Sequence, residues 1–408
     1  MKICIVGGGV TGLVAAHMLG PEHEVDLYEK RDHLGGCLSS YRINGYCLEE
    51  FYHHCFSGDT DLFSLMQDLC IFDRLEWLNG TTGYYSQKTI YPLSSPLEIL
   101  KYPELSLREK ARLALLVMNA KKMDVGDLDA VTARNFILDR LGENIYRSFF
   151  EPLLISKFGE NRDKVSAAWL ISRIAIRSNR GVSGERLGYL KGGFQTLIDA
   201  LETAIGRHCV VRLNDPVESL QKDIHGWRVN GRLYDTVLST LPPHLLGVPG
   251  TTAAPRIPYQ GAACMAMGIE RDITDGIYWL NMKDPAPYGA VVSHTNFVPK
   301  DRYGEHIVYL ASYFSGEMPP HIDRKMLEDF CSRFNISESE VHWKRLAVEP
   351  LAGPVYTTGY RKLMPEYARN GLFFAGMFSP PNYPERSMNG AVVAGVEVAK
   401  LIGRPEDI

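Results

Sequence analysis

The first thirty residues show a strand pattern, a helix pattern and a second strand pattern. Residues 2–6 form a short apolar run, residues 13–19 carry apolar positions at helical spacing, and residues 24–29 alternate as a half-buried strand does. A strand, a helix and a strand joined by short connections predict a βαβ unit at the start of the chain.

The period of the apolar positions then changes twice. Helical spacing dominates residues 97–205, while period-2 alternation begins near residue 209 and includes an Asn230-Gly231 turn typical of hairpins. The clearest predicted helices cover residues 107–120, 133–141, 194–205 and 389–402. The predicted later strands cover residues 262–269, 277–282, 290–297, 306–314 and 372–375. With no linker between them, these patterns indicate domains that interleave in sequence.

Composition narrows the class of protein. The chain has 408 residues, 45% hydrophobic and 23% charged, which are ordinary globular values. A net charge of −4 argues against a nucleic-acid partner, and no apolar run reaches the roughly 20 residues of a membrane span. Eight scattered cysteines and a strand starting at residue 2 lead us to expect a reduced, cytoplasmic protein without a leader. The cysteines and histidines lack ligand spacing, so we expect no metal site.

The loop between the first strand and helix fits a dinucleotide fingerprint. In Gly7-x-Gly9-x-x-Gly12, the first glycine makes the turn, the second admits a pyrophosphate, and the third allows close helix packing. A branched residue at Gly9 should therefore block the phosphate and strain the backbone. Glu29 ends the next strand, where its carboxylate is placed to accept hydrogen bonds from a ribose. The helix start offers free N–H groups to phosphates.

A second glycine pair follows the fingerprint. Lys30 and Arg31 precede Gly35-Gly36, which is close enough to join the same phosphate site. Arg31 can balance pyrophosphate charge, and the glycines allow close approach of the backbone. A simple nicotinamide dehydrogenase has no need of this second element.

These segments resemble a known family. The run from GGGVTGLVAA through Glu29 to LGG resembles the FAD-dependent amine oxidase, protoporphyrinogen oxidase and phytoene desaturase superfamily, and more distantly UDP-galactopyranose mutase. The similarity continues at residues 189–201, at Pro216-Val217, at residues 239–242 and at residues 371–400. It covers about a third of the chain, is spread from end to end, and implies FAD as the cofactor.

The resemblance also implies which residues hold FAD. The expected contacts are Gly7, Gly9, Val10, Thr11, Gly12, Glu29, Lys30, Arg31, Gly35, Gly36, Val217, Thr240, Gly376, Met377, Met388, Gly390, Ala391 and Val392. Gly390-Ala391-Val392 should begin a helix whose N-terminus faces the flavin pyrimidine. Met377 stands where many members carry an acidic residue, so side-chain binding there is in doubt.

The candidates for catalysis come from three places. His53 and His54 follow a loop that passes the flavin's reactive face in relatives, and Arg386 precedes the helix at the flavin. Tyr313 lies on a predicted strand of the substrate domain. Structural roles compete with catalysis for each of them.

The predicted fold class is α/β, with a Rossmann-like FAD-binding domain interleaved with an α+β substrate domain that combines an antiparallel sheet and a helical cap. The FAD-binding domain is assigned residues 1–90, 189–256 and 346–408, and the substrate domain residues 91–188 and 257–345. The predicted function is hydride transfer to FAD from a C–N or C–C bond of a small or lipophilic substrate, with reoxidation by O₂ or another acceptor. The alternatives are a flavin-dependent nucleotide-sugar mutase and a non-catalytic flavin-bound scaffold.

The helix predicted over residues 107–120 leaves a choice between a membrane-surface contact and ordinary packing. Ordinary packing is favoured, because the exposed face should carry Arg108, Lys110 and Arg112.

Overall fold

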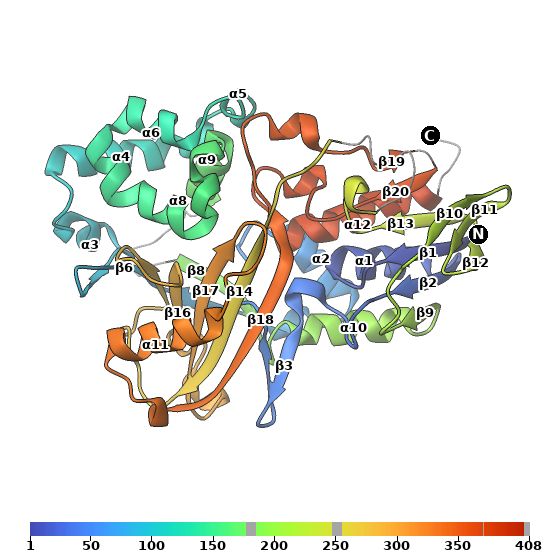
Figure 1. The fold of residues 1–408 in the computed structure, drawn as a ribbon, viewed down its shortest axis with the longest axis horizontal. Helices are drawn as coiled ribbons and strands as arrows, with labels where there is room; N and C mark the ends of the chain where they lie inside the picture. Colours follow the sequence, from blue (N-terminus) through green and yellow to red (C-terminus); the bar gives the residue numbers. More distant parts are fainter. Residues whose placement is uncertain (177–184, 247–254, 370, 404–408) are drawn as a thin grey trace. The chain divides into compact units, whose positions relative to one another are not determined.

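The structure is a computed structural model that describes residues 1–176, 185–246, 255–369 and 371–403. The chain forms two compact units, shown in Figure 1. Unit 1 comprises residues 1–76, 189–257 and 361–408, and unit 2 comprises residues 77–188 and 258–360. The predicted helical stretch over residues 97–205 includes residues 177–184, which lie outside the described residues.

Unit 1 is built around a six-stranded sheet in the order β19-β20-β13-β1-β2-β9. β1 pairs in parallel with β2, as the βαβ pattern predicts, and also with β13, and β19 adds an antiparallel edge. Helix α1 packs against both α10 and α12. The elements are β1 (Lys2–Val6), α1 (Val10–Leu19), β2 (Glu24–Tyr28), β3 (Ser40–Ile43), β4 (Tyr46–Glu49), α2 (Thr60–Asp68), α10 (Gln195–Ile205), β9 (Cys209–Arg212), β10 (Leu220–Asp223), β11 (Gly226–Val229), β12 (Arg232–Tyr234), β13 (Thr236–Ser239), β19 (Ala368–Arg369), β20 (Leu372–Phe374) and α12 (Met388–Gly403).

Unit 2 combines a seven-stranded sheet with helices. The strand order is β18-β14-β17-β16-β15-β6-β7, and the pairs are antiparallel except β15 with β6. The elements are β6 (Thr82–Ser86), β7 (Thr89–Pro92), α3 (Pro96–Lys101), α4 (Leu107–Asn119), α5 (Val125–Leu128), α6 (Ala133–Leu141), α7 (Glu143–Ile145), a π-helical turn (Tyr146–Phe150), α8 (Glu151–Phe158), α9 (Ala167–Ile176), β14 (Tyr259–Ile269), β15 (Trp279–Met282), β16 (Ala290–Ser293), β17 (His306–Phe314), α11 (Ile322–Phe334) and β18 (Val341–Pro354). β5 (Leu75–Gly80) and β8 (Glu185–Leu190) cross the unit boundaries.

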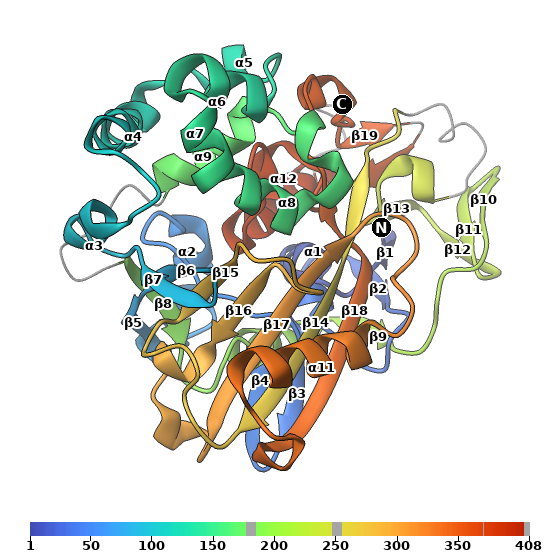
Figure 2. The ribbon, with the colours of Figure 1, turned by 60° about the vertical axis from the view of Figure 1, so that its left-hand side comes forward.

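One face of this sheet covers a hydrophobic core. Met265 and Met267 on β14 and Leu310 on β17 lie in a hydrophobic core, and α11 contributes Met326 and Phe330 to it. Figure 2 shows α11 crossing that face of the sheet. The opposite face carries the alternate residues of each strand.

The unit boundaries differ from two of the predicted domain boundaries. Residues 77–90 belong to unit 2, because β6 pairs with β15 and β7 pairs with β6 in its sheet. Residues 346–360 also belong to unit 2, because β18 continues along β14 as far as Pro354.

Candidate functional site

The turn after β1 is packed so closely that positions 7 and 12 allow only glycine. Gly7 has φ +106°, and a Cβ there would lie 2.1 Å from Oγ1 of Thr240. A Cβ on Gly12 would lie 2.0 Å from the carbonyl oxygen of Gly7. Thr240 donates its hydroxyl to the Val6 carbonyl at 2.8 Å, which fixes it beside the turn. These two glycines and Thr240 therefore set the shape of the loop.

The backbones of Gly9 and Gly36 lie close together, with no side chain between them. Gly35 N–H donates to the Gly8 carbonyl at 2.9 Å, and Gly9 and Gly35 form a parallel bridge. A Cβ on Gly36 would lie 3.2 Å from the Gly9 Cα, whereas a Cβ on Gly9 would lie 4.0 Å from its nearest neighbour, the Gly36 Cα. Gly9 has φ −76°, so the expected backbone strain at this position is wrong. The surface fits a pyrophosphate, which needs close approach to the backbone.

Glu29 is buried at the end of β2, with 7% of its surface exposed. Its Oε2 accepts from Gly8 N–H at 2.8 Å, and its Oε1 accepts from Arg31 N–H at 2.9 Å. Each carboxylate oxygen has a second lone pair that could accept a ribose hydroxyl. The Arg31 guanidinium forms an ion pair with Glu50 at 3.1 Å, so a carboxylate of the protein already offsets its charge. Lys30 is exposed.

The loop that carries Val217 lies beside the same strand end. Asn214 N–H donates to the Arg31 carbonyl at 2.9 Å, and Asp215 N–H donates to the Glu29 carbonyl at 3.0 Å. Val217 is half-buried two residues farther on. The backbone therefore brings the predicted adenine contact near the predicted ribose contact.

The closing motif is attached to the first one by hydrogen bonds. The Thr11 hydroxyl donates to the Ala391 carbonyl at 3.1 Å, which joins the first turn of α1 to the first turn of α12. A Cβ on Gly376 would lie 2.7 Å from the Thr240 carbonyl oxygen. Val10 is buried at the start of α1, and Met377 and Met388 are half-buried. Residues more than 360 positions apart in the sequence thus meet in one unit.

Helix α12 begins at Met388, one residue before the helix predicted over residues 389–402 and two residues before Gly390. The Ser387 hydroxyl accepts from Gly390 N–H at 2.9 Å, and the Ser387 carbonyl accepts from Ala391 N–H at 3.1 Å. Val392 is 2% exposed and faces the core. Because Ser387 already binds two of the predicted amides, the N–H groups of the helix's first two residues are the better candidates for a flavin contact.

Two of the catalytic candidates, His53 and Arg386, lie near one another in unit 1. The ring nitrogen Nδ1 of His53 lies 2.6 Å from the Phe51 carbonyl oxygen, so this nitrogen carries the proton and Nε2 is left to accept one. Burial, opposed in part by that hydrogen bond and assisted by the charge of Arg386, lowers the pKa of His53 to about 4. His53 is therefore neutral near pH 7. His54 packs its ring edge-on against Phe56 at 5.2 Å.

The fourth candidate, Tyr313, lies on β17 of unit 2 directly opposite Ala262 of β14. The residue missed by sequence reasoning is Gln260, two positions before Ala262 and on the same face. Gln260 is 1% exposed, and neither its Oε1 nor its Nε2 has a hydrogen-bond partner in the described part of the chain. The sequence signal for Gln260 is that a single amide residue stands directly before the apolar run GAACMAMGI.

The described residues contain neither a metal-binding cluster nor a membrane-spanning helix. Within these ranges no group of three or more His, Cys, Asp or Glu side chains could hold a metal ion. Among the helices described, none is long and apolar enough to cross a membrane.

Comparison with known proteins identifies relatives of this arrangement. Residues 10–403 match the model of the flavin-containing amine oxidoreductases. Coproporphyrinogen III oxidase of Mycobacterium tuberculosis is 26% identical over 226 residues, covering 48% of this chain and 49% of the relative. The enzyme of the same name from Staphylococcus aureus is 25% identical over 286 residues, covering 59% and 60%. The match thus spans about half the length of these curated relatives.

Solved structures share the fold. Reduced UDP-galactopyranose mutase superimposes with a TM-score of 0.76 at 18% identity, covering 98% of this chain and 95% of the mutase. Cyclohexylamine oxidase from Brevibacterium oxydans superimposes with a TM-score of 0.70 at 16% identity, covering 100% and 99%. The glycine-lined cradle fits FAD, the cofactor that the family model implies, and the chain belongs to the flavin-containing amine oxidoreductase family.

Proposed function

We propose that this enzyme removes a hydride from a C–N or C–C bond of a small or lipophilic substrate, and that the reduced cofactor is reoxidised by O₂ or another acceptor. Bound FAD supplies the two-electron redox chemistry, while the protein positions the substrate and controls protons. The substrate's remaining proton leaves to a base or to water. The observation that carries this proposal is an apolar face of small side chains in unit 2.

That face runs across four neighbouring strands. Cys264 of β14 lies opposite Ala311 of β17 and Ala347 of β18, and Ala311 lies opposite Ala290 of β16. Directly paired residues of an antiparallel sheet share a face. These four side chains are buried, with 2–5% exposed, and Tyr309 and Tyr313 of β17 lie on the same face on either side of Ala311. Small apolar side chains in register suit a flat substrate with little polar surface.

Gln260 adds one polar group to this face. A buried amide without hydrogen bonds costs about 1–3 kcal/mol, so its retention supports a role for it in the liganded enzyme. The amide can donate through Nε2 and accept through Oε1, which suits a substrate group with both capacities. Tyr313, opposite the adjacent Ala262, is the proposed neighbour of that group.

In unit 1 we propose distinct tasks for the predicted residues. Gly9 and Gly36 admit the pyrophosphate of FAD, Glu29 binds the adenosine ribose, and the half-buried Val217 contacts adenine. His53 takes up a proton at Nε2, because Nδ1 is held by the Phe51 carbonyl. Arg386 opposes full protonation of that ring and keeps it a weak base.

The direct test is an anaerobic screen of amines, polyenes, porphyrinogens and UDP-sugars, followed by the loss of oxidised-flavin absorbance. Bleaching with formation of an oxidised product supports the proposal. Isomerisation of a UDP-sugar that requires reduced flavin would instead establish the mutase, and no turnover with any class would favour the scaffold.

The sheet face is tested with Gln260→Met and the exposed control Gln221→Met. Gln260→Met should raise the melting temperature, because it removes an unpaired buried amide, and should lower kcat/KM for the substrate found in the screen. If Gln260→Met melts higher and turns over as the wild type does, Gln260 is not a substrate contact.

A further inference from the structure

Helix α2 is not capped by the residue at its own N-cap position. That residue, Asp59, is 8% exposed, and its side chain makes no hydrogen bond to the first turn of the helix. The Asp59 carboxylate accepts from Phe56 N–H at 2.8 Å instead, and the Phe56 carbonyl accepts from Asp59 N–H at 3.1 Å. A side chain that would ordinarily cap a helix therefore closes the turn before it.

The cap of α2 comes from the start of α12. Asn389, the second residue of α12, accepts with Oδ1 from Leu62 N–H at 2.9 Å. Leu62 is the third residue of α2, and the amide at that position is one that an N-cap side chain binds. The Nδ2 of Asn389 also donates to the Asp61 carboxylate at 3.1 Å. One side chain thus joins the first turns of two helices across 327 residues of sequence.

The start of α12 is itself held firmly by other parts of unit 1. Asn382 is 1% exposed, accepts from Ser387 N–H at 3.2 Å and donates to the Gly376 carbonyl at 3.1 Å. A Cβ on Gly395 would lie 2.8 Å from the Thr11 carbonyl oxygen, so α12 packs closely against α1. α12 is therefore the support to which Asn389 attaches α2.

The loop of residues 53–59, called the histidine loop below, is attached to α2 in turn. Asp59 is both the N-cap residue of α2 and the residue that holds Phe56 N–H. The Phe56 ring packs edge-on against His54 at 5.2 Å, and His54 follows His53. A series of direct contacts therefore runs from α12 through Asn389, α2 and Asp59 to the two histidines.

We propose that Asn389 is a positioning residue, which holds the histidine loop in place against the start of α12. The inference rests on the proposed function, in which His53 takes up a proton, and on the start of α12 as the flavin contact. The amide of Asn389 makes two hydrogen bonds at once and is half-buried, so water competes less for them. Without this cap the first turn of α2 would open more often, and Asp59 with it.

The test is amide hydrogen exchange of the FAD-loaded protein. Asn389→Ala should speed exchange in the histidine loop, at Phe56 above all, by about fivefold or more. The double variant Asn389→Asp with Asp61→Asn keeps an acceptor for Leu62 and reverses the direction of the second bond, without a change in net charge. Its exchange rate at Phe56 should stay within about twofold of the wild type.

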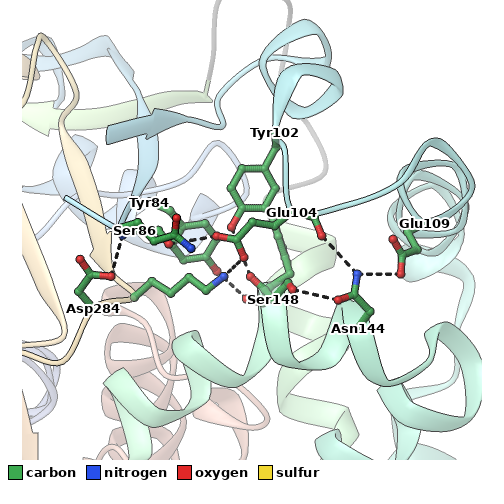
Figure 3. Close-up of polar contacts among 11 residues, drawn as sticks. Tyr84, Ser86, Tyr102, Glu104, Glu109, Asn144, Ser148 and Asp284 are labelled. Carbon is green, nitrogen blue, oxygen red and sulfur yellow. Dashed lines mark hydrogen bonds and ion pairs between the residues drawn. The ribbon is translucent and has the colours of Figure 1, made fainter. Parts of the chain in front are cut away.

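Asn144→Ala in unit 2 is the matched control. Figure 3 shows Asn144, whose Nδ2 donates to the Glu109 carboxylate at 2.9 Å and to the Glu104 carbonyl at 3.2 Å, so this side chain also joins separate segments. Lys110 holds α4 independently: it is 9% exposed, not on the exposed face as the sequence pattern predicts, and donates Nζ to the Leu100 carbonyl at 2.6 Å. The control should therefore fold, with wild-type exchange in the histidine loop.

All three variants should keep the wild-type FAD content, because the glycines and Glu29 are untouched. With the substrate that the screen yields, Asn389→Ala should lower kcat about tenfold and leave KM nearly unchanged, since a displaced proton acceptor acts on turnover. Asn144→Ala should change neither constant.

Faster exchange confined to residues 60–62 would show that Asn389 only caps α2 and would overturn the inference. An equal effect of Asn144→Ala on the histidine loop, or a double variant as unprotected as Asn389→Ala, would overturn it as well. None of these results touches the proposed hydride transfer. A substrate screen without turnover would contradict that function and leave the exchange measurement as it stands.

Discussion

At the scale of single residues, Gly9 and Gly12 lie in one loop but are constrained by different atoms. A Cβ on Gly12 would collide with the Gly7 carbonyl oxygen at 2.0 Å, whereas a Cβ on Gly9 would lie 4.0 Å from its nearest neighbour, the Gly36 Cα. The fingerprint indicates that both positions need glycine. Only the packing in three dimensions separates a glycine required by the fold from one that leaves room for a ligand.

Gly9→Val is therefore expected to fold without binding FAD. Its backbone has an ordinary φ of −76°, and the new side chain would occupy the surface proposed for the pyrophosphate. Gly12→Val should instead fail to fold, and Gly58→Ala, at an open position, serves as the control. Flavin content by absorbance and folding by circular dichroism measure both effects. A Gly9→Val protein with stoichiometric FAD would place the phosphates elsewhere.

His53→Gln should flatten the dependence of stability on acid pH. The pKa of the native His53 is lowered to about 4 from 6.5, so the unfolded chain binds a proton between these values and the native state does not. Stability therefore falls as pH drops from about 6.5 to about 4, by up to about 3 kcal/mol for this group. Denaturant unfolding at several pH values measures the slope, with the exposed His208→Gln as control. Equal slopes in His53→Gln and the wild type would contradict the shift.

At the scale of elements, sequence reasoning succeeded where an element has clear ends in the sequence. β1 and β17 have the predicted bounds because each is a continuous apolar run that is almost wholly buried, and α6 has them because Thr132 caps its start and Gly142 follows its end. β18 was missed although it spans Val341–Pro354, because it is an edge strand with charged residues on its exposed side and a register shift against β14. His294 was expected in a strand, but it begins a short 3₁₀ helix and lies 2.8 Å from the Tyr303 hydroxyl.

The junction of β4 with α10 supplies a test at this scale. Glu49 is fully buried, and its carboxylate accepts from the Tyr189 hydroxyl at 2.8 Å and from Phe194 N–H, beside the start of α10, at 2.6 Å. Burial raises the pKa of Glu49 more strongly than these hydrogen bonds lower it. Ionisation of Glu49 therefore lowers the stability of the native state as the pH rises above the usual pKa of a carboxyl group.

Glu49→Gln should consequently gain stability relative to the wild type as pH rises from about 4 to 7. The amide keeps an acceptor for Phe194 and carries no charge to desolvate. Melting temperatures of both proteins across this range measure the difference, and the exposed Glu22→Gln should show no such trend. A difference that stays constant, or that falls as pH rises, would show that the hydrogen bonds outweigh the desolvation.

At the scale of the whole molecule, the FAD site proposed for unit 1 is assembled from segments far apart in the sequence. Thr11 donates a hydrogen bond to Ala391, and Thr240 packs against Gly7 and Gly376. The loop before Val217 is hydrogen-bonded to the end of β2. The motifs could be recognised along the sequence because each has its own local backbone requirement. The small-residue face and Gln260 could not, because register across four strands decides which side chains share a face.

This assembly predicts that apoprotein is stabilised by FAD and much less by FMN. FMN lacks the adenosine that Glu29 and Val217 are proposed to hold, so it should leave the end of β2 and the 214–217 loop without a ligand. A ligand at 100 times its Kd adds about 2.7 kcal/mol to the stability of the native state. The measurement is the melting temperature of the apoprotein titrated with FAD, FMN or NAD, with Gly9→Val as the control that should respond to none. Equal stabilisation by FMN and FAD would remove Glu29 and Val217 from the site and leave only the α12 end of the cradle as a flavin contact.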